Sequence, residues 1–356
     1  MKAFLILEDG TVFTGTSIGS TKETISEIVF NTAMSGYLEV LTDPAAAGQA
    51  IVMTYPLIGN YGVTPDGESK KAWADAIIVR ELSRRASNFR CEGDLIDYLN
   101  EQNIPGICGI DTRAVTKLLR EKGAMKCMIT TDEKFDLDVA IDMLKTFKAD
   151  NYVLKATEKE KRVIPGEGKK VALLDFGSKG NIVESLNSRG CEVTIYPAFT
   201  SAEEVIGSAP DGILLSNGAG DPSECVEIID EIQKLSETDI PVLGIGFGHL
   251  LMALAQGGRT YKMKNGHRGG NYAVKDMRTG RVYISSQNHG YAVDETSFAA
   301  SVAVPAFVNV NDGTNEGMSY VNKKIMTVQF QLETGSGQKD LGYVFDEFMN
   351  MMGGEQ

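Results

Sequence analysis

A regular alternation of buried strands and helices in residues 170–255 constrains the fold more than any other feature of this sequence. Residues 170–176 form a near-continuous apolar run that ends at Gly177, a pattern typical of a strand buried on both faces. Further strands are predicted at 192–196, 212–216 and 241–245, with helices at about 181–188, 222–235 and 248–255. This order predicts an α/β fold with a mostly parallel sheet flanked by helices, whose ligands bind at the carboxyl ends of the strands.

The strand at 241–245 leads directly into the next helix through the segment GIGFG at residues 244–248. A G-x-Nuc-x-G turn of this kind holds its central residue in a strained backbone, which exposes a nucleophilic side chain. The backbone N–H of the following residue, here Phe247, then serves an oxyanion. The central residue of this chain is Gly246, which has no side chain to expose. The segment therefore predicts the geometry of a nucleophile turn without the nucleophile.

A second glycine-rich turn, NGAGDP at residues 217–222, follows the strand at 212–216. Gly218 and Gly220 allow backbone N–H groups to face a ligand, and Asp221 then starts a helix. The turn is not a phosphate loop, because no Gly-Lys-Ser/Thr follows it. Such turns are more often structural than functional, so this one assigns no activity by itself.

The 356 residues suggest two domains. The charged run KATEKEKRVIPGEGKK at 155–170 has no apolar periodicity and predicts a solvated linker. We therefore expect a mixed α/β domain at 1–152, a linker at 153–170 and the α/β domain at 171–356. The first domain is expected to contain strands at 3–7, 51–54 and 76–79 and helices at 91–100 and 112–121, the last capped by Asp111 or Thr112.

The formal net charge of −13 argues against nucleic-acid binding, which needs a basic surface, and against binding to an anionic membrane. No segment approaches the roughly 18 consecutive apolar residues of a membrane span. The N-terminal segment meets acidic residues too early for a signal peptide. An odd number of cysteines without a CxxC pair favours a reducing, cytoplasmic location and predicts no metal site. The three histidines, His249, His267 and His289, are the only candidates for histidine-based chemistry.

Sequence segments along the whole chain resemble one family. In the first half they are EDG at 8–10, VFNT at 29–32, LTDP at 41–44, TYPLIGN at 54–60, ASNFR at 86–90 and IDTR at 110–113. In the second half they are LSNG at 215–218, GHRG at 266–269, QNHG at 287–290 and NDGT at 311–314. The second half resembles a class I glutamine amidotransferase domain, and the whole chain resembles the small, glutamine-hydrolysing subunits of carbamoyl phosphate synthetases.

The resemblance implies a catalytic triad: a cysteine at the turn, a histidine that removes its proton and later protonates ammonia, and a glutamate that orients the histidine. The matching positions are Gly246, Gln331 and Glu333, so only the glutamate is retained. The side-chain amide of Gln331 cannot shuttle a proton, because it does not titrate near neutral pH. The resemblance thus implies a catalytic centre that has lost both reacting groups.

The resemblance also implies a substrate-binding set. Ala45 stands where the family has serine, Leu250 stands where it has glutamine, and Tyr291 replaces the usual phenylalanine, whereas Asn288 and Gly290 keep the pattern. The predicted set is Ala45, Gly218, Gly220, Phe247, Leu250, Asn288, Gly290 and Tyr291.

Coordinated losses at Gly246, Gln331, Leu250 and Ala45 favour a small subunit that does not hydrolyse glutamine. We expect it to dock on a large synthetase subunit through its first domain and to support ammonia-dependent carbamoyl phosphate synthesis for arginine and pyrimidine biosynthesis. No cofactor is expected in this chain, because ATP and Mg²⁺ belong to the large subunit in the family. Glutamine and glutamate stay candidate ligands.

Two alternatives stay open. The chain could be a regulatory or ligand-binding pseudoenzyme no longer tied to the synthetase, or a glutaminase with an unconventional nucleophile such as Cys225. An ordinary buried thiol explains Cys225 better, and His249 fits a structural helix histidine better than a base. His267 and His289 are expected to shape the site without serving as the triad histidine.

Overall fold

The computed structural model describes residues 1–332 and 340–353, which divide into two compact units, Met1–Asp150 and Asn151–Gln356. The linker expected at 153–170 is structured within the second unit. It contains the helix α5 (Tyr152–Ala156), whose Val153 is buried, and the strand β10 (Arg162–Ile164), which pairs with β12. The boundary therefore falls near residue 150, before the charged run.

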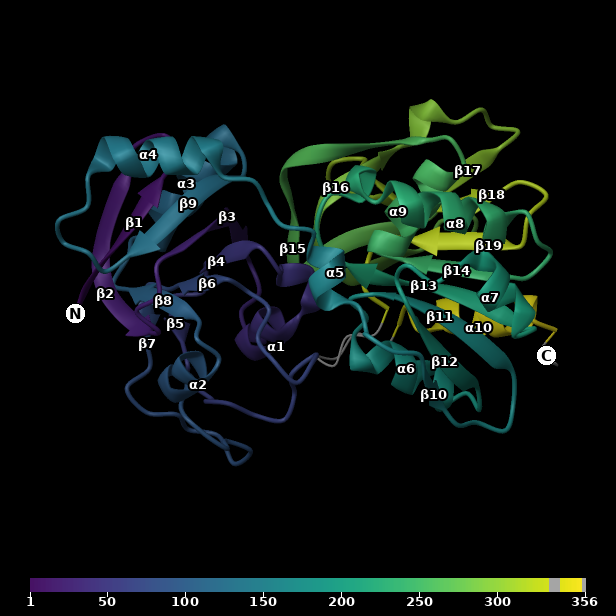
Figure 1. Cartoon of the computed structure of the whole chain (residues 1–356), viewed down its shortest axis with the longest axis horizontal. Coiled ribbons are helices and arrows are strands. Elements are labelled where there is room, and N and C mark those ends of the chain that lie inside the picture. The colour runs from purple at the N-terminus through teal and green to yellow at the C-terminus, as the bar shows by residue number, and fades with distance from the viewer. Residues whose placement is uncertain (333–339, 354–356) are drawn as a thin grey trace. The chain divides into compact units, whose positions relative to one another are not determined.

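The first unit is a closed barrel with strand order β1-β2-β8-β6-β4-β3-β9 (Figure 1). Its barrel strands are β1 (Lys2–Leu7), β2 (Val12–Gly19), β3 (Thr24–Asn31), β4 (Gln49–Met53), β6 (Ala76–Ile78), β8 (Pro105–Cys108) and β9 (Met125–Thr130). The helices are α1 (Tyr37–Thr42), the 3-10 turn η1 (Pro44–Ala46), α2 (Leu95–Glu101), α3 (Thr112–Lys122) and α4 (Leu137–Thr146), and β5 (Leu57–Ile58) pairs with β7 (Glu81–Leu82). The strands β3, β4, β6 and β8 run parallel, so their carboxyl ends lie at one end of the barrel.

The second unit contains a sheet of order β10-β12-β11-β13-β14-β19-β18-β17-β15-β16. Its strands beyond β10 are β11 (Lys170–Phe176), β12 (Glu192–Pro197), β13 (Gly212–Gly218), β14 (Val242–Ile245), β15 (Arg259–Asp276), β16 (Val282–Asp294), β17 (Ala303–Asn309), β18 (Asn315–Tyr320) and β19 (Ile325–Val328). The strands β12, β11, β13 and β14 are parallel, as predicted. The strand β19 is also parallel to β14, and the remaining pairs are antiparallel.

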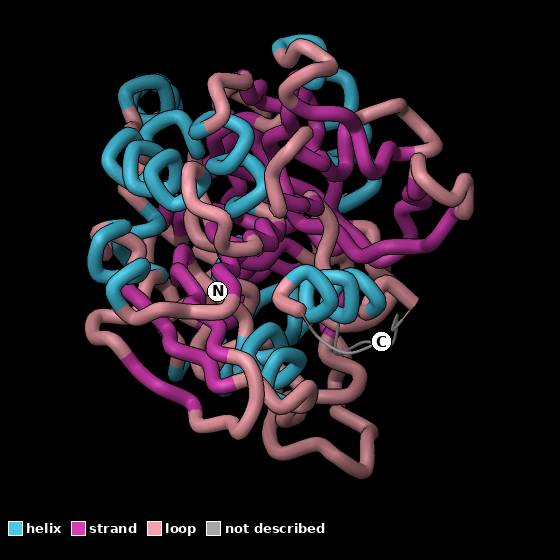
Figure 2. Tube along the Cα trace, turned by 90° about the vertical axis from the view of Figure 1, so that its right-hand side faces the viewer, coloured by secondary structure: helices cyan, strands magenta, loops and turns pink. Residues whose placement is uncertain are grey.

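Helices cover both faces of this sheet (Figure 2). They are α6 (Gly180–Asn187), α7 (Ala202–Gly207), α8 (Val226–Ser236), α9 (Phe247–Ala255) and α10 (Tyr343–Met351), with short turns η2 (Pro222–Glu224) and η3 (Glu295–Ser297). One apolar core joins α7, α8 and α9 to the sheet, and a second joins α6 and α10 to the opposite face. The predicted α/β architecture is therefore confirmed. Within the described residues, no helix combines the length and apolarity that a membrane crossing requires.

Candidate active site

The strand β14 ends in a sharp turn at Gly246, from which α9 begins at Phe247. Gly246 has φ 56° and ψ −105°, a left-handed conformation that residues with a Cβ adopt only under strain. Its N–H donates a hydrogen bond to the carbonyl of Val328 (2.8 Å), and its carbonyl accepts one from the N–H of Leu250 (3.3 Å). This geometry matches the nucleophile turn expected from the sequence.

The two glycines that flank the turn are required by close packing. A Cβ on Gly248 would lie 2.3 Å from the carbonyl oxygen of Leu215, and one on Gly244 would lie 2.8 Å from Cγ2 of Thr327. At Gly246 the nearest atom to an added Cβ is Cβ of Asn217, at 3.3 Å. The flanking positions therefore exclude side chains, whereas a side chain at the central position would need a small shift of Asn217 and a strained backbone.

The loop after β13 lies at the same edge of the sheet. A Cβ on Gly218 would lie 2.6 Å from the carbonyl oxygen of Phe176, and Gly220 has φ 102°. Asp221 accepts a hydrogen bond from the N–H of Ser223 (2.9 Å), which caps η2. The other carboxylate oxygen of Asp221 accepts a hydrogen bond from the hydroxyl of Tyr291 (3.1 Å), which joins this loop to β16.

The predicted positions on β16 and after β19 are also brought to this region. Asn288 and Gly290 are partly exposed, and they alternate along β16 with the buried His289. Gln331 forms an isolated bridge to Ser286, whose carbonyl accepts a hydrogen bond from the Gln331 N–H (2.9 Å). The strand that carries Asn288 thus also holds Gln331, which the sequence resemblance assigns to the position of the family histidine.

Leu250 and Phe247 are core residues. They are 3% and 5% exposed, and both belong to the apolar cluster that joins α9 to the sheet. The Phe247 ring also packs edge-on against that of Phe176, with 6.2 Å between centroids. The apolar contacts around position 250 therefore stabilise a leucine there. The same apolar neighbours would leave the polar atoms of a side-chain amide without hydrogen bonds.

Ala45 is in η1 of the first unit, where it is 8% exposed and its N–H donates a hydrogen bond to the Asp43 carboxylate (2.9 Å). Glu333 lies outside the described residues.

His249 is fully buried in α9, and its Nδ1 lies 2.8 Å from the Thr327 hydroxyl. Burial lowers the pKa of His249 to about 3. An imidazole with so low a pKa is a poor proton acceptor at neutral pH. This position fits the structural role expected for His249.

His267 of β15 lies between two carboxylates. Its Nε2 is 2.8 Å from Asp312 Oδ2, and its Nδ1 is 3.2 Å from Glu316 Oε1. Burial lowers the pKa of His267. The hydrogen bonds and negative charges of Glu316 and Asp312 have a larger combined effect, so the pKa of the imidazole is raised. Burial likewise raises the pKa of Glu316, against the opposing hydrogen bonds from His267 and Asn309. Both shifts keep a proton on the His267–Glu316 pair.

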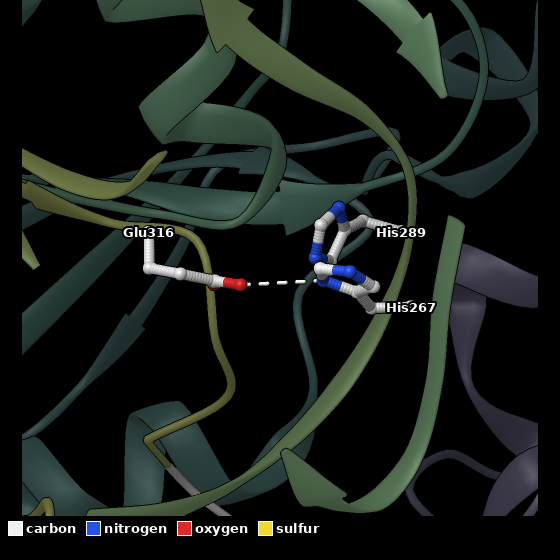
Figure 3. Close-up of side chains that lie close together, drawn as sticks. All are labelled: His267, His289 and Glu316. Carbon is white, nitrogen blue, oxygen red and sulfur yellow. Dashed lines mark ion pairs between the residues drawn. The ribbon is translucent and has the colours of Figure 1, made fainter. Parts of the chain in front are cut away.

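His289 of β16 lies beside this pair (Figure 3). Its Nδ1 is 2.9 Å from the carbonyl oxygen of Tyr291, and its Nε2 is 3.0 Å from Gln287 Oε1. Burial and the neighbouring His267 hold the pKa of His289 well below its usual value. Both ring nitrogens are thus engaged in positioning contacts.

His267, His289 and Glu316 each offer one possible metal-ligand atom, and these atoms lie within 4.8 Å of one another (Figure 3). The three residues are therefore close enough together to hold a metal ion. His267 already contacts the carboxylates of Asp312 and Glu316, and these contacts raise the pKa of its imidazole. The contacts of His267 with these carboxylates therefore explain why the three side chains lie together. The cluster joins β15, β16 and β18.

Cys225 follows η2 and is buried, with Sγ 4.0 Å from the carbonyl oxygen of Asp221. Burial, followed by the charges of Glu224 and Asp221, raises the pKa of the Cys225 thiol to about 11. Nucleophilic cysteines need the thiolate near neutral pH, so these properties fit an ordinary buried thiol.

Sequence reasoning missed two features of this region. The Tyr291–Asp221 hydrogen bond joins residues far apart in sequence, and no local pattern predicts it. Glu316 did have a signal, because an acidic residue inside the buried strand β18 requires a partner. That partner, His267, was named only as a residue that shapes the site.

Comparisons with known proteins agree with this arrangement. Residues 5–129 match the family model "Carbamoyl-phosphate synthase small chain, CPSase domain", and residues 172–351 match "Glutamine amidotransferase class-I". The chain is 48% identical to the carbamoyl phosphate synthase small chain of Clostridium perfringens over 350 residues, which cover 98% of this chain and 99% of that one. The small chain of Clostridium acetobutylicum is 44% identical over 357 residues, covering 99% and 100% of the two chains.

Among solved structures, a glutamine amidotransferase from Thermotoga maritima aligns with 52% of this chain and 86% of its own length. The identity is 17% and the TM-score is 0.39. Identity above 40% over nearly the full length of both small chains is decisive for the family. This chain belongs to the carbamoyl phosphate synthase small chain family, with a class I glutamine amidotransferase domain in its second unit.

Proposed function

We propose that this chain is a carbamoyl phosphate synthetase small subunit without glutaminase activity, which supports ammonia-dependent synthesis by a large subunit. The observation that carries the proposal is Gly246 at the centre of the strained turn between β14 and α9. Acyl transfer from glutamine begins when a thiolate forms a bond to the side-chain carbonyl carbon, and ammonia then leaves with a proton from an imidazole. A glycine supplies no atom for the first bond.

The described residues offer no evident substitute for the missing groups. The amide of Gln331 cannot accept and return a proton, His249 has a pKa of about 3, and His267 is held by two carboxylates. The Cys225 thiol has a pKa of about 11 and follows η2, so it does not stand at the central position of the turn between β14 and α9. These properties support a scaffold that keeps the shape of the amidotransferase domain without its chemistry.

The partner follows from family membership. A small chain implies a large subunit, which would bind ATP and Mg²⁺ and make carbamoyl phosphate from bicarbonate and free ammonia for arginine and pyrimidine biosynthesis in the cytoplasm. We assign docking on that subunit to the first unit.

Reconstitution tests this proposal. The chain is mixed with the large subunit encoded in the same genome, and carbamoyl phosphate is measured with ammonium or with glutamine as nitrogen donor. We expect synthesis with ammonium and none above background with glutamine, and the large subunit alone provides the reference rate. A glutamine-supported rate equal to that with ammonium would disprove the proposed loss of glutaminase activity.

A second candidate is a ligand-binding module independent of the synthetase. It is favoured by Asn288 and Gly290, which keep the family pattern and stay partly exposed on β16, and by the glycine loop that Tyr291 holds through Asp221. Isothermal titration with glutamine and with glutamate, beside a pull-down of the large subunit, separates the two candidates. Binding of an amino acid without any association with the large subunit would favour this second function.

A further inference from the structure

The helix α3 presents a row of positive charges to solvent. Arg113, Lys117 and Arg120 are exposed and spaced by four and three residues, which places them on one face of the helix over roughly 10 Å. Together with Thr54, Thr116 and Glu121 they line a groove of about 690 Å³. The groove is therefore basic in a chain whose formal net charge is −13.

Two of these cations lack partners. Within residues 1–332 and 340–353, the guanidinium groups of Arg113 and Arg120 form no ion pair or hydrogen bond. Lys117 has only an exposed contact of 3.9 Å with Glu121. By contrast, Lys122 of the same helix is bound to Asp9 at 2.6 Å. An acidic chain that leaves two neighbouring arginines unpaired retains positive charge available for a partner.

Apolar groups lie beside this groove at the carboxyl ends of parallel strands. Tyr55 and Leu57, which follow Thr54 after β4, are 38% and 36% exposed. The N–H of Glu81 donates a hydrogen bond to the carbonyl of Pro56 (3.0 Å), and the carbonyl of Arg80 accepts one from Gly109 (3.1 Å), just before α3. These bonds place the exposed Arg80 between the 54–57 segment and α3.

Arginine and aromatic residues are enriched in protein–protein interfaces, where a few of them carry most of the binding energy. A binding site for a small anion needs converging donors, but not exposed apolar side chains beside them. The combination of unpaired arginines with Tyr55 and Leu57 therefore favours a protein partner with an acidic surface. We propose that the barrel-end surface, formed by Thr54–Leu57, Arg80 and the Arg113–Arg120 face of α3, binds an acidic patch on the synthetase large subunit.

This inference rests on the proposed function, which supplies the large subunit as partner. The test measures the Kd between the full chain and the large subunit by sedimentation, over a series of salt concentrations. The double variant Arg113→Glu/Arg120→Glu should raise the Kd by about tenfold or more at low salt, and added salt should narrow the difference. Arg113→Ala/Arg120→Ala and Tyr55→Ala/Leu57→Ala should weaken binding by smaller factors.

The matched control is Lys134→Glu/Lys148→Glu, which makes the same charge change at exposed lysines on either side of α4. It should leave the Kd unchanged, and circular dichroism verifies that each variant is folded. If the arginine and control variants bind as tightly as the wild type, the surface assignment is overturned and the proposed function stands.

Two further outcomes also overturn the assignment. If the wild-type chain does not bind the large subunit at all, the surface proposal fails together with the proposed partner. If inorganic phosphate or pyrophosphate binds the wild type, and the arginine variants lose that binding but keep the large subunit, the groove is a small-anion site.

Discussion

At the scale of single residues, the site depends on where a Cβ atom can be accommodated. The backbone conformation of Gly246 disfavours a Cβ, and the backbone oxygen of Leu215 excludes one at Gly248. These are different constraints with different costs. A left-handed φ strains the backbone by about 1–3 kcal/mol, whereas an overlap with a neighbouring strand forces the packed elements apart.

Alanine substitutions separate these costs. We expect Gly246→Ala to lower the free energy of unfolding by about 1–3 kcal/mol, and Gly248→Ala to lower it by more or to prevent folding. Gly207→Ala is the control, because an added Cβ meets nothing within 4 Å there. The measurement is urea unfolding followed by circular dichroism. If Gly246→Ala and Gly248→Ala lower the free energy of unfolding equally, the elements packed around Gly248 can move apart at little energetic cost.

The proposed loss of the reacting groups can also be tested by restoring them. Gly246→Cys alone should react slowly with a glutamine-mimicking alkylating agent, because no imidazole takes the thiol proton. Addition of Gln331→His should accelerate adduct formation by about tenfold or more, since a positioned base typically contributes 10²–10⁴-fold. Adduct mass by mass spectrometry gives the rate, and Gln331→His alone is the control. Equal rates for the single and double variants would mean that a side chain at position 331 does not reach the turn.

The sequence resemblance predicts the positions of the site, but it could not supply their contacts. Leu250 could be recognised as a change from glutamine, yet its burial among the side chains of α9 depends on the packed sheet. The Tyr291–Asp221 bond also needed the folded chain, because it depends on the register of β16 relative to the loop after β13.

At the scale of elements, the strands and helices predicted for residues 170–255 are observed, because each is an apolar run or stripe flanked by turn residues. The helix predicted at 222–235 is divided into η2 and α8, since Cys225 has φ −94° and ψ 46°. The charged run at 155–170 concealed β10, a three-residue edge strand in which Arg162 and Val163 are exposed and Ile164 is half-buried. Short, charged edge strands lack the apolar pattern on which strand prediction depends.

The helix α9 holds a histidine whose titration affects stability. In the unfolded chain His249 gains a proton below a pH of about 6.5, whereas in the folded chain its pKa is about 3. The unfolded state therefore binds more protons between these values, so His249 makes the fold less stable as the pH falls through this window. The loss amounts to at most about 1.4 kcal/mol per pH unit.

We therefore expect His249→Gln, which keeps a polar group near Thr327, to flatten the fall in stability between pH 6 and pH 4. The measurement is the free energy of unfolding in urea at several pH values. Burial and His267 hold the pKa of His289 low in both proteins, so the comparison reports the contribution of His249 together with its smaller coupling to His289. Parallel curves for the two proteins would contradict the assignment of a neutral His249.

At the scale of the whole molecule, each unit has its own apolar cores. Leu99 belongs to a core of the first unit and Phe348 to one of the second, and both are fully buried. The closure of the barrel could not be predicted from sequence, because β9 pairs with both β1 and β3 and neither partner follows from a local pattern. The order of the parallel strands was easier to expect, since crossover helices leave few arrangements.

Separate cores predict separate effects of core mutations. Leu99→Ala should lower stability by about 2–5 kcal/mol and shift the fluorescence transition of Trp73, the only tryptophan, which lies in the first unit. Phe348→Ala should cost about 3–5 kcal/mol and mainly increase hydrogen exchange in β11 of the second unit. Equal shifts of both probes in each variant would show that the two units unfold as one.

The glycine at the turn also has a consequence for oxidative damage. Catalytic cysteines are readily oxidised because their thiolate form is stabilised, and this chain has none at the turn. Burial raises the pKa of Cys108, Cys127, Cys191 and Cys225, which keeps these thiols protonated and slow to react. On the proposed function, a glycine at the turn removes the thiol at which peroxide would inactivate a cysteine-dependent relative.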